Sequence, residues 1–469
     1  MTPEDVDVAV IGAGPAGLAA ARASASAGAG TVLLDANPRP GGQYYRQPGR
    51  TGVAPTRSQR EGQALFEDAV EAGAEPRLGV SVWSATHRYG RVELDTHSAK
   101  GDRGRVRARC TVVAVGAHER FVPIPGWTLP GVFSAGGVQT FLKEQGIPVG
   151  SRVVLGGTGP LQLVVAAELA RHGVDVPALF ELARPVSHAL RHPTAVLTGA
   201  WGQWARMSEG AHAAITLART HCPVRVGWTI TEVLGSTRVE GIRAAPVDSG
   251  DQPITARAIE IDCDAVALHH SLVPNTELLR LLGVELQLQP GTGHWVPRRT
   301  TDLETSADNV FAAGDGSGIG GLALSLVEGA IAGQSAAAKA LAQPTRITRT
   351  MAVRLRREQR FQRLYAELFR IPDALVTALS TPETTVCRCE GVTAGDLDCA
   401  IAQGAATSYL AKAVTRAGMG PCQGRLCAPT VDARLRSSGA EPRPLSRAVR
   451  APLTALPMRA LTKDIQSDD

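Results

Sequence analysis

Aromatic residues are scarce in this chain of 469 residues, since Phe, Trp and Tyr together make up only 4% of it. So low a content argues against a sugar-binding or base-stacking surface. The formal net charge of +5 is small for this length and gives no signature of nucleic-acid binding. There is no run of about 18 apolar residues, so we expect no segment that spans a membrane. The acidic N-terminus enters a predicted strand at once, so we also expect no signal peptide and a cytoplasmic protein.

The beginning of the chain predicts a strand–turn–helix–strand unit, with strands at Val6–Ile11 and Thr31–Leu34. A glycine-rich turn follows the first strand and consists of Gly12, Ala13, Gly14, Pro15, Ala16 and Gly17. In such a turn the first glycine makes the bend, the second lets a pyrophosphate approach, and the third allows the helix to pack closely. The pyrophosphate then lies at the positive end of the helix. Asp35 stands near the spacing of about 20 residues expected for the acid that binds a ribose hydroxyl, so the unit predicts dinucleotide binding.

Two further segments indicate which dinucleotide is bound. The glycine pair before Gln43 is Gly41–Gly42, and it suits backbone contact with a second part of a long cofactor. Much later, a predicted strand at 309–313 leads to Gly314 and Asp315, which places an acid at the end of a distant strand. Flavin adenine dinucleotide (FAD) is long enough to need both segments, and the late acid would then lie near its ribityl chain.

These segments resemble the glutathione-reductase-like flavoproteins, which have two dinucleotide-binding domains, and the resemblance covers residues 5–345. It implies that the early glycines and Asp35 hold the ADP half of FAD, while Gly314 and Asp315 meet the ribityl and pyrophosphate groups. It also implies a crossing strand and turn that contain Gly116, and an adenine contact at Val82. The predicted fold class is therefore α/β, with two Rossmann-like domains.

A second glycine-rich unit begins at residue 152 and contains Gly157 and Gly159. Its third glycine position is Gln162, whose side chain obstructs close packing of helix and strand. Glu181, at the end of the next predicted strand, is placed to bind a ribose diol. NAD(H), another adenine nucleotide and a purely structural role all stay open for this module.

The cysteine pair that disulfide reductases of this superfamily carry near the first or second module is missing. The early region Gly41–Pro48 has no cysteine, and Cys222 stands alone in the second module. This argues against a thioredoxin or glutathione reductase. The helix predicted across 346–380, with five arginines, is read as a solvated connector, and an anionic docking surface is the alternative.

The C-terminal part contains two closely spaced cysteine pairs, Cys387 with Cys389 and Cys422 with Cys427. Short helices at 394–403 and 408–416 would bring the two loops to one point, and two thiolate pairs can close around an iron–sulfur cluster. The segment resembles the bacterioferritin-associated-ferredoxin-like [2Fe-2S] domain, although its second pair is spaced Cx4C and not CxxC. Tetrahedral zinc and an empty, degenerate site are the competing interpretations. The other four cysteines are expected to be small core residues, and they are Cys110, Cys222, Cys263 and Cys399.

Three short sequence motifs and the four-cysteine domain narrow the resemblance to one group of proteins. The motifs are Ala114–Arg120, Pro125–Val132 and Gly137–Thr140. They are similar to the alpha-type subunits of heteromeric amine and amino-acid dehydrogenases. This group includes the larger subunit of opine oxidase, the second subunit of hydrogen cyanide synthase, and the alpha subunits of proline and hydroxyproline dehydrogenases. The similarity runs from residue 5 to about residue 435.

The resemblance implies a division of labour between subunits. A separate FAD-dependent, amino-acid-oxidase-like beta subunit would oxidise a secondary amine or amino acid, and its electrons would pass to the FAD and cluster of this chain. A small ferredoxin-like subunit is a further expected partner in some complexes. No residue of this chain is assigned as acid, base or nucleophile, and Tyr44, Tyr45 and His118 are read as packing or partner contacts. The alternatives are a self-sufficient NADH-dependent flavin and iron–sulfur reductase, and a scaffold subunit without a redox role.

The sequence thus predicts six segments along the chain. They are a first FAD-binding segment (1–145), an inserted NAD(P)-binding-like domain (146–270), a second FAD-binding segment (271–345), a helical connector (346–380), a [2Fe-2S] domain (381–435) and a Pro/Arg-rich tail (436–469). The tail is expected to be either a strap across a neighbouring subunit or a mobile segment.

Overall fold

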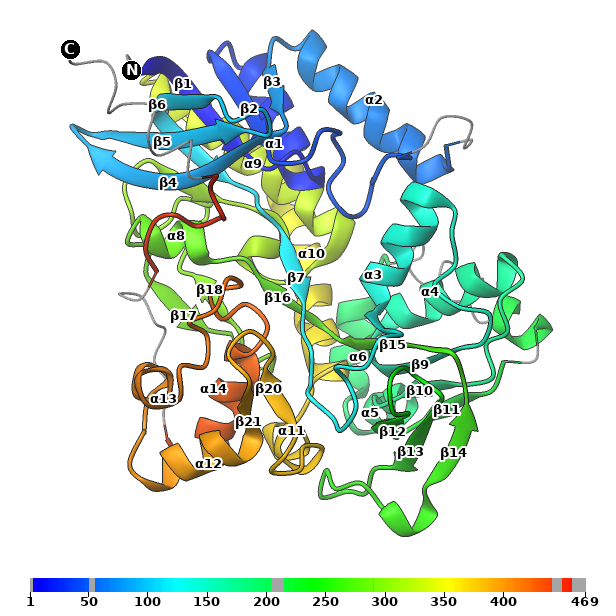
Figure 1. Ribbon diagram of the computed structural model, residues 1–469. Helices are drawn as coiled ribbons and strands as arrows, with labels where there is room; N and C mark the ends of the chain where they lie inside the picture. Colours follow the sequence, from blue (N-terminus) through cyan, green and yellow to red (C-terminus); the bar gives the residue numbers. More distant parts are fainter. Residues whose placement is uncertain are drawn as a thin grey trace.

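The computed structural model describes residues 3–49, 55–203, 215–220, 222–289, 291–440 and 449–457. Two sheet-containing modules lie one above the other in the view of Figure 1, and a small helical module lies below the first and beside the second. Within the described residues, no helix combines the length and the apolar character needed to cross a membrane.

The first module is built on a seven-stranded sheet in the order β3-β2-β1-β6-β5-β4, with β19 paired to the end of β6. Its strands are β1 (Glu4–Ile11), β2 (Thr31–Asp35), β3 (Glu75–Leu78), β4 (Val80–Arg88), β5 (Arg91–Ser98), β6 (Arg103–Val113) and β19 (Val310–Ala312). The late strand β19 pairs in parallel with β6, so a segment from the second half of the chain completes the first sheet. The sequence predicts a second FAD-binding segment in this part of the chain, and that assignment stays a prediction.

Three helices accompany this sheet, namely α1 (Pro15–Ser26), α2 (Arg57–Glu71) and α9 (Gly321–Ala340). Helices α1 and α9 approach each other closely because both have small residues at the contact. A Cβ added at Gly329 would lie 2.1 Å from the carbonyl oxygen of Ala16, and one at Gly333 would lie 2.2 Å from that of Ala20. Glycine at these two positions therefore sets the distance between the helix that follows the first glycine turn and the helix that follows the late acid.

The second module contains a five-stranded parallel sheet in the order β11-β10-β9-β15-β8 and a three-stranded antiparallel sheet, β12-β13-β14. The parallel strands are β8 (Val132–Ser134), β9 (Val153–Thr158), β10 (Leu179–Glu181), β11 (Val224–Val226) and β15 (Ala265–His270). The antiparallel strands are β12 (Trp228–Leu234), β13 (Gly241–Pro246) and β14 (Ile259–Asp262). Its helices are α3 (Ala135–Thr140), the π-helical η1 (Phe141–Gln145), α4 (Pro160–Arg171), α5 (Pro185–Arg191), α6 (Pro193–Ala200) and the 3₁₀ turn η2 (Thr255–Arg257). Strand β8 pairs with β15, so the second sheet includes a strand that comes before residue 146. The domain boundary that the sequence places at residue 146 stays a prediction.

Two short antiparallel strands, β7 (Ala117–Glu119) and β16 (Leu272–Pro274), carry the chain from the first module to the second and back. Figure 1 shows them in the middle of the molecule. After the return come α8 (Glu277–Leu281), β17 (Leu286–Leu288), β18 (Trp295–Pro297) and the 3₁₀ turn η3 (Gly314–Ser317).

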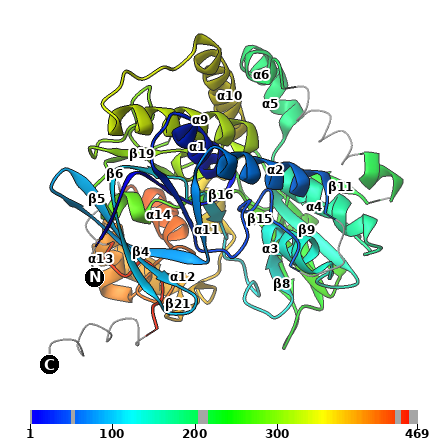
Figure 2. The same ribbon diagram turned by 90° about the horizontal axis from the view of Figure 1, so that it is seen from above.

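The connector consists of two helices, α10 (Arg349–Leu368) and α11 (Asp373–Ala378). Helix α10 packs against α9 and against α6, as Figure 2 also shows, so it contacts both sheet-containing modules. Five arginines of this helix are exposed, in agreement with a solvated outer face, and they are Arg354, Arg356, Arg357, Arg360 and Arg363. The opposite face is buried, so the connector is an integral part of the packing.

The C-terminal module comprises β20 (Thr385–Cys387), β21 (Val392–Thr393), α12 (Ala394–Ala402), α13 (Ser408–Thr415) and α14 (Ala428–Ser437). Helices α12 and α13 begin where the sequence predicts them, because Thr393 and Thr407 act as N-caps that accept hydrogen bonds from Asp396 N and Leu410 N. The predicted tail begins within the last turns of α14, and its next described segment, 449–457, packs against the first module of the same chain. There the backbone N–H of Leu453 donates to the carbonyl oxygen of Trp83 in β4 at 2.8 Å.

Candidate functional site

The first glycine turn has the close contacts that make glycine necessary. A Cβ at Gly12, where φ is +103°, would lie 2.4 Å from the carbonyl oxygen of Ala114, and one at Gly17 would lie 1.6 Å from the carbonyl oxygen of Gly12. Gly14 is the N-cap of α1 and Pro15 is its first residue, so the helix begins with free backbone N–H groups. Such a helix N-terminus is suited to binding a pyrophosphate.

The carboxylate of Asp35 lies at the end of β2 and faces this turn. It accepts a hydrogen bond from Ala13 N at 2.5 Å and another from Asn37 N at 2.7 Å, and 8% of Asp35 is exposed. These bonds hold the carboxylate beside the turn that the sequence predicts to bind the pyrophosphate. The position agrees with its predicted role toward a ribose hydroxyl, which stays a prediction.

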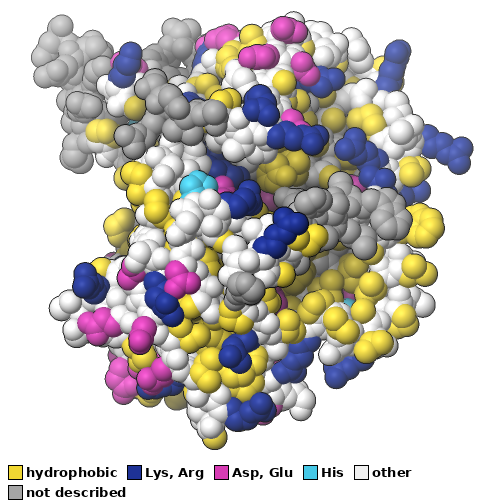
Figure 3. Space-filling model, turned by 90° about the vertical axis from the view of Figure 1, so that its right-hand side faces the viewer, with side chains coloured by type: hydrophobic (Ala, Val, Ile, Leu, Met, Phe, Trp, Pro, Cys, Tyr) yellow, Lys and Arg dark blue, Asp and Glu magenta, His cyan; other side chains and the backbone are white. Residues whose placement is uncertain are grey.

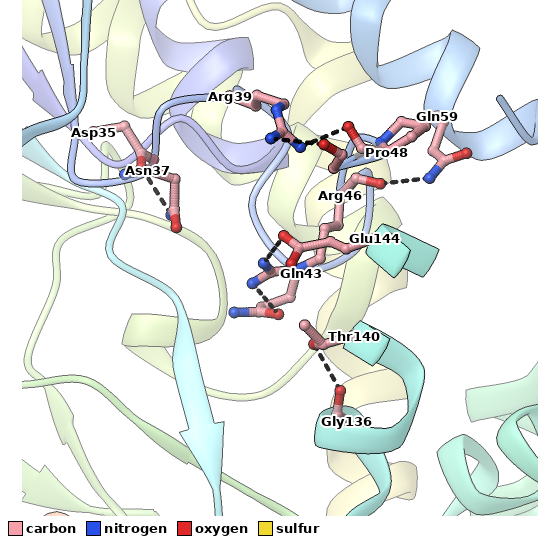
Figure 4. A network of polar contacts seen from close by, with 11 residues as sticks. Asp35, Asn37, Arg39, Gln43, Arg46, Pro48, Gln59, Gly136, Thr140 and Glu144 are labelled. Carbon is pink, nitrogen blue, oxygen red and sulfur yellow. Dashed lines mark hydrogen bonds and ion pairs between the residues drawn. The ribbon is translucent and has the colours of Figure 1, made fainter. Parts of the chain in front are cut away.

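The second glycine segment lies directly against the first. A Cβ at Gly42, where φ is +58°, would lie 2.8 Å from the Cα of Gly14, so this approach requires glycine at position 42. The next side chain, Gln43, accepts a hydrogen bond at 2.8 Å from Arg46, whose guanidinium pairs with Glu144 at 2.5 Å (Figure 4). Glu144 comes from η1 of the second module, so an ion pair between modules holds the Gln43 loop in place.

The late acid stands in the turn η3 at the end of β19. Asp315 accepts hydrogen bonds from Gly320 N and Gly321 N, both at 2.9 Å, and thereby holds the start of α9. The preceding residue, Gly314, donates from its backbone N–H to Glu328 at 2.9 Å. Glu328 is 1% exposed, and it forms a two-bond ion pair with Arg299 at 2.9 Å. The sequence reasoning missed this pair, which only the fold brings together.

The predicted FAD residues converge from four segments. A Cβ at Gly314 would lie 2.7 Å from that of Ala16, and one at Gly316 would lie 3.1 Å from the carbonyl oxygen of Gly116. A Cβ at Gly116 itself would meet nothing within 4 Å, so this turn has open space beside it. Val82 lies on β4, partly buried, and pairs with Thr96 of β5. Close backbone approach and an open turn are what a long dinucleotide requires, so the residues present fit FAD.

The second glycine turn has a different interior. Gly157 and Gly159 have φ values of +144° and +112°, as a nucleotide cradle requires. Gln162, however, is completely buried, and its side-chain amide donates to Glu181 at 2.6 Å. Glu181 also accepts from Gly159 N at 3.1 Å and Ala183 N at 2.8 Å, so its carboxylate is bound by its own chain. Burial raises the pKa of Glu181, and the hydrogen bonds to it oppose that shift.

An aromatic side chain of the connector helix approaches this second turn. The hydroxyl oxygen of Tyr365 would lie 3.2 Å from a Cβ at Gly159. Burial raises the pKa of this hydroxyl, and the nearby Asp315 and Glu181 add to the effect. Because Tyr365 belongs to α10, the connector covers the mouth of the second turn. No local sequence signal marked this residue.

The four C-terminal cysteines form two contacting pairs, each with one cysteine from either loop. Cys389 is hydrogen-bonded to Cys422, and Cys427 is hydrogen-bonded to Cys387. Among the described residues, no three His, Cys, Asp or Glu side chains are grouped so as to hold one metal ion. A two-iron cluster takes two thiolates at each iron, so two separate pairs fit it better than they fit a single tetrahedral ion.

Glycines let the two cysteine loops close on each other. A Cβ at Gly420 would lie 2.1 Å from that of Cys389, and Gly418 has a φ of +82°, a backbone conformation that favours glycine. Cys387 and Cys427 are buried while Cys389 is exposed, so one edge of the site faces solvent. Burial raises the pKa of the Cys427 thiol, with a smaller contribution from Cys387, and bound iron would offset this by stabilising the thiolates.

The remaining cysteines divide into two groups. Burial raises the pKa of Cys110 and Cys263 to about 12 and that of Cys222 to about 11, in keeping with three core thiols. The expectation of a core position is wrong for Cys399, which is exposed. Helix α12 turns this position away from the buried face that contains Leu397 and Ala400.

The aromatic residues near the flavin turns have mixed environments. Tyr45 is 4% exposed and lies against Gly62, while Tyr44 is 40% exposed and meets Tyr45 edge to face. Trp127, within the phrase that suggested the family, donates from Nε1 to the carbonyl oxygen of Thr385 at 2.7 Å. The guanidinium of Arg388 lies over its ring. Trp127 thus joins the chain just before the second module to the first strand of the cysteine module.

Comparison with known proteins identifies both parts of the chain. Residues 6–333 match the family described as pyridine nucleotide-disulphide oxidoreductase, and residues 385–437 match the BFD-like [2Fe-2S] binding domain. A subunit of opine oxidase from Agrobacterium tumefaciens is 35% identical, and the alignment covers 91% of this chain and 84% of that protein. Hydrogen cyanide synthase subunit HcnB of Pseudomonas aeruginosa is 30% identical, with 91% and 92% covered.

A solved structure extends the likeness to the whole fold. L-proline dehydrogenase from P. horikoshii superposes with a TM-score of 0.69 at 19% sequence identity, over 98% of this chain and 80% of that chain. The predicted fold class, the FAD and [2Fe-2S] cofactors and the resemblance to these subunits are confirmed. The chain belongs to the pyridine nucleotide-disulphide oxidoreductase family, as a flavin-dependent oxidoreductase that carries a C-terminal BFD-like [2Fe-2S] binding domain.

Proposed function

We propose that this chain relays electrons within a heteromeric amine or amino-acid dehydrogenase. In this proposal a partner flavin subunit oxidises a secondary amine or amino acid, such as an opine, proline, hydroxyproline or a glycine-like compound. FAD would accept electrons in pairs, and the [2Fe-2S] cluster would release them singly. The residues of this chain then bind, orient and insulate the two cofactors, and none of them acts on the amine.

The observation that carries the proposal is the docking of the cysteine module onto the second sheet-containing module of the same flavoprotein chain. The hydrogen bond from Trp127 to Thr385, at 2.7 Å, anchors β20 immediately before Cys387. Residues of α11 and α14 share one hydrophobic core with Trp127, including Leu375, Val376 and Ala433. A cluster held on a fixed surface of a flavoprotein is the arrangement that an internal relay needs.

Exposed apolar side chains support assembly with a partner. Figure 3 shows hydrophobic side chains gathered in the lower part of the face that carries the second sheet. Large exposed hydrophobic residues also lie on or next to α13 in the cysteine module, and they are Tyr409, Leu410, Val414 and Met419. Large apolar patches on a protein surface commonly mark interaction sites. Met419 stands next to Gly420, which packs against the exposed Cys389, so a partner on this surface would be suited to exchange electrons with the cluster.

The relatives support the proposal through their names. The opine oxidase relative and hydrogen cyanide synthase subunit HcnB are each named as one subunit of a larger enzyme, and the first of these enzymes is named for the oxidation of an opine. The names do not extend to the partner of this chain. An amino-acid-oxidase-like beta subunit, with a small ferredoxin-like subunit in addition, is the partner that we propose.

The test is to purify the chain anaerobically, alone and after co-expression with a candidate flavin subunit. We expect one FAD and about two irons per chain, as a [2Fe-2S] centre requires. Candidate amines should bleach the flavin and produce a reduced-cluster EPR signal in the complex and not in the isolated chain. Bleaching of the isolated chain by an amine would contradict the division of labour.

Serine substitutions identify the cluster ligands in the same preparation. Cys387→Ser, Cys389→Ser, Cys422→Ser and Cys427→Ser should each lower the iron content while FAD is retained. Cys399→Ser is the matched control, because this exposed cysteine lies in the same module and outside the two contacting pairs. Full iron content in a ligand variant, or zinc in place of iron in the native chain, would overturn the assignment.

The NADH-dependent reductase is the second candidate, favoured by the left-handed backbone of Gly157 and Gly159. It requires a nucleotide to enter where Gln162, Glu181 and Tyr365 now lie against the turn. Rapid anaerobic bleaching of the isolated chain by NADH would support it. A spectrum unchanged by NADH supports the relay, and iron with a measurable potential would exclude a redox-inert scaffold.

A further inference from the structure

A histidine on the strand between the two modules connects the predicted flavin turn to the cluster loop. On one side, Nδ1 of His118 lies 2.6 Å from Oδ1 of Asn275. On the other side, Nε2 of His118 donates to the carbonyl oxygen of Arg425 at 2.9 Å. Arg425 stands inside the loop that begins at Cys422 and ends at Cys427.

Asn275 continues this connection to the flavin turn. Its side-chain Nδ2 donates to the carbonyl oxygen of Val115 at 3.1 Å, and its backbone N–H donates to that of Gly116 at 3.0 Å. A sequence of direct hydrogen bonds can therefore run from Gly116 through Asn275 and His118 to Arg425, and because both partners of the His118 ring are oxygens it requires an N–H on each ring nitrogen. The residues at its ends are 309 apart in sequence but belong to the two candidate cofactor sites.

The surroundings make this connection important for the position of the loop. A cavity of about 740 Å³ lies between the cysteine module and the second flavin-binding segment, and both His118 and Cys427 line it. Close packing is thus interrupted on this side of the loop. The side chain of Arg425 pairs with Glu277 at 3.2 Å and donates to the carbonyl oxygen of Leu453 at 3.1 Å. The backbone of the loop, in contrast, is held to the crossing strand by His118.

We propose that His118 is a positioning residue for electron transfer, which holds the Cys422–Cys427 loop at a fixed place relative to the flavin turn through Asn275. The inference rests on the proposed relay. In each transfer one electron leaves the reduced flavin and enters the oxidised cluster, no bond between heavy atoms changes, and the flavin releases its protons to solvent. The amine supplies the two electrons, and a one-electron acceptor reoxidises the cluster between transfers.

The experiment uses the FAD- and iron-loaded chain after reduction with dithionite. The reduced protein is mixed with ferricyanide, flavin oxidation is followed by absorbance, and the cluster is followed by freeze-quench EPR. Because Cys389 is exposed, we expect ferricyanide to take electrons from the cluster first. His118→Phe keeps a ring and removes both hydrogen bonds, so flavin oxidation should slow by about tenfold or more, as small displacements of reacting groups can do. Cluster oxidation should stay fast.

A conservative variant and a control separate positioning from folding. In His118→Gln one side-chain amide can still donate to Arg425, so flavin oxidation should return to within about threefold of the native rate, one weak hydrogen bond having been lost. His172→Phe removes an exposed histidine that bonds to the carbonyl oxygen of Glu168, and it should change nothing. Hydrogen exchange of amides in 422–427 should be faster in His118→Phe and not in His172→Phe. Equal flavin oxidation rates in the native chain and His118→Phe would overturn the proposal, as would equal defects in the Phe and Gln variants.

A cluster-free chain distinguishes failure of this inference from failure of the proposed function. In Cys387→Ser/Cys389→Ser, slow flavin oxidation would show that electrons leave through the cluster. An unchanged rate in that variant would show that the relay itself is wrong, whatever His118 does. A slow cluster-free chain together with a normal His118→Phe would leave the relay standing and refute the positioning role alone.

Discussion

The side-chain amide of Gln162 donates a hydrogen bond of 2.6 Å to the carboxylate of Glu181, and both residues are buried. Gln162 occupies the position where a dinucleotide-binding turn usually has its third glycine. The pair therefore turns a cradle for a nucleotide into an internally satisfied polar contact. A glycine-rich turn with the correct backbone is thus compatible with a module whose main role is structural.

Replacing Gln162 by Leu should destabilise the protein in a pH-dependent way. The change removes a donor to a buried carboxylate, which costs about 1–3 kcal/mol of unfolding free energy. Burial already raises the pKa of Glu181 in the folded state, and loss of the Gln162 bond raises it further. A raised folded pKa means that folding takes up a proton, so stability is lost as pH rises from the ordinary carboxylate range through the folded pKa.

Urea unfolding at pH 5 and pH 8 checks this prediction, and the loss in Gln162→Leu should be larger at pH 8. Gln63→Leu is the matched control, because Gln63 donates to Glu67 at 2.9 Å on an exposed helix face. Its effect should be below about 0.5 kcal/mol at both pH values. A larger loss at pH 5 than at pH 8 would contradict the assigned environment of Glu181.

The ion pair of Arg299 and Glu328 should stabilise the late flavin-binding turn. Glu328→Leu leaves a largely buried guanidinium without its partner, so we expect a loss of about 3–5 kcal/mol of unfolding free energy. The double variant Arg299→Met/Glu328→Leu should recover much of that loss, because no unpaired charge remains. Both variants remove the acceptor of Gly314 N–H and should release FAD more readily on dilution. Urea unfolding of Arg299→Met, Glu328→Leu and the double variant tests this, and a double-variant loss equal to the sum of the two single losses would show that the two charges do not depend on each other.

Local patterns in the sequence predict much of this structure. Elements that depend on residues close together in the chain can be predicted from the sequence. They include the glycine turns, the strands that end at Asp35 and Glu181, and the helices that follow Thr393 and Thr407. The side chain of Cys399 was misplaced because a short helix with small residues on several faces does not reveal which face is buried.

Contacts between distant residues could not be predicted in this way. Trp127 meets Thr385, and His118 meets Arg425, only after three modules have packed together. The sequence places Trp127 within a motif that resembles the family, and it predicts only a packing or partner contact for His118. Their actual partners depend on the path of β7 between the sheets, for which single-sequence periodicity holds no information.

Buried histidines should make the fold sensitive to acid. Burial, with smaller effects of His269 and Arg120, lowers the pKa of His270 to about 3. His270 therefore takes up a proton near pH 6.5 in the unfolded chain, but only near pH 3 in the folded chain. A lowered folded pKa of a base means that stability is complete above the unfolded pKa and falls as pH decreases through that window.

Replacing His270 by Met should reduce this pH dependence. Between about pH 6.5 and pH 3 each such histidine contributes a slope of about 1.4 kcal/mol per pH unit, and the variant should lose that slope. Unfolding free energies measured by urea titration at several pH values provide the test. His172→Met, at an exposed position, should keep the native slope. An unchanged slope in His270→Met would mean that the ring is protonated in the folded protein.

The first glycine turn gives the most direct steric prediction for the flavin site. A Cβ at Gly17 would lie 1.6 Å from the carbonyl oxygen of Gly12, a distance that no rotamer can relieve because both atoms belong to the backbone or its first branch. Gly17→Ala must therefore push α1 away from β1 and open the turn at Gly12–Gly14, where we expect the pyrophosphate. The purified variant should contain little FAD and unfold at a lower urea concentration.

Gly28→Ala provides the matched comparison for this change. Gly28 lies just after the same helix with φ at +85°, and a Cβ there would meet nothing within 4 Å. Gly28→Ala should lower the free energy of unfolding by only about 1–2 kcal/mol, because alanine is strained in a left-handed backbone, and the FAD content should not change. If Gly17→Ala retained one FAD per chain while Gly28→Ala lost it, close packing of α1 on β1 would not be what forms the flavin site. The expected opposite result would show that the third glycine acts through space, by holding the helix N-terminus at the distance that a pyrophosphate requires.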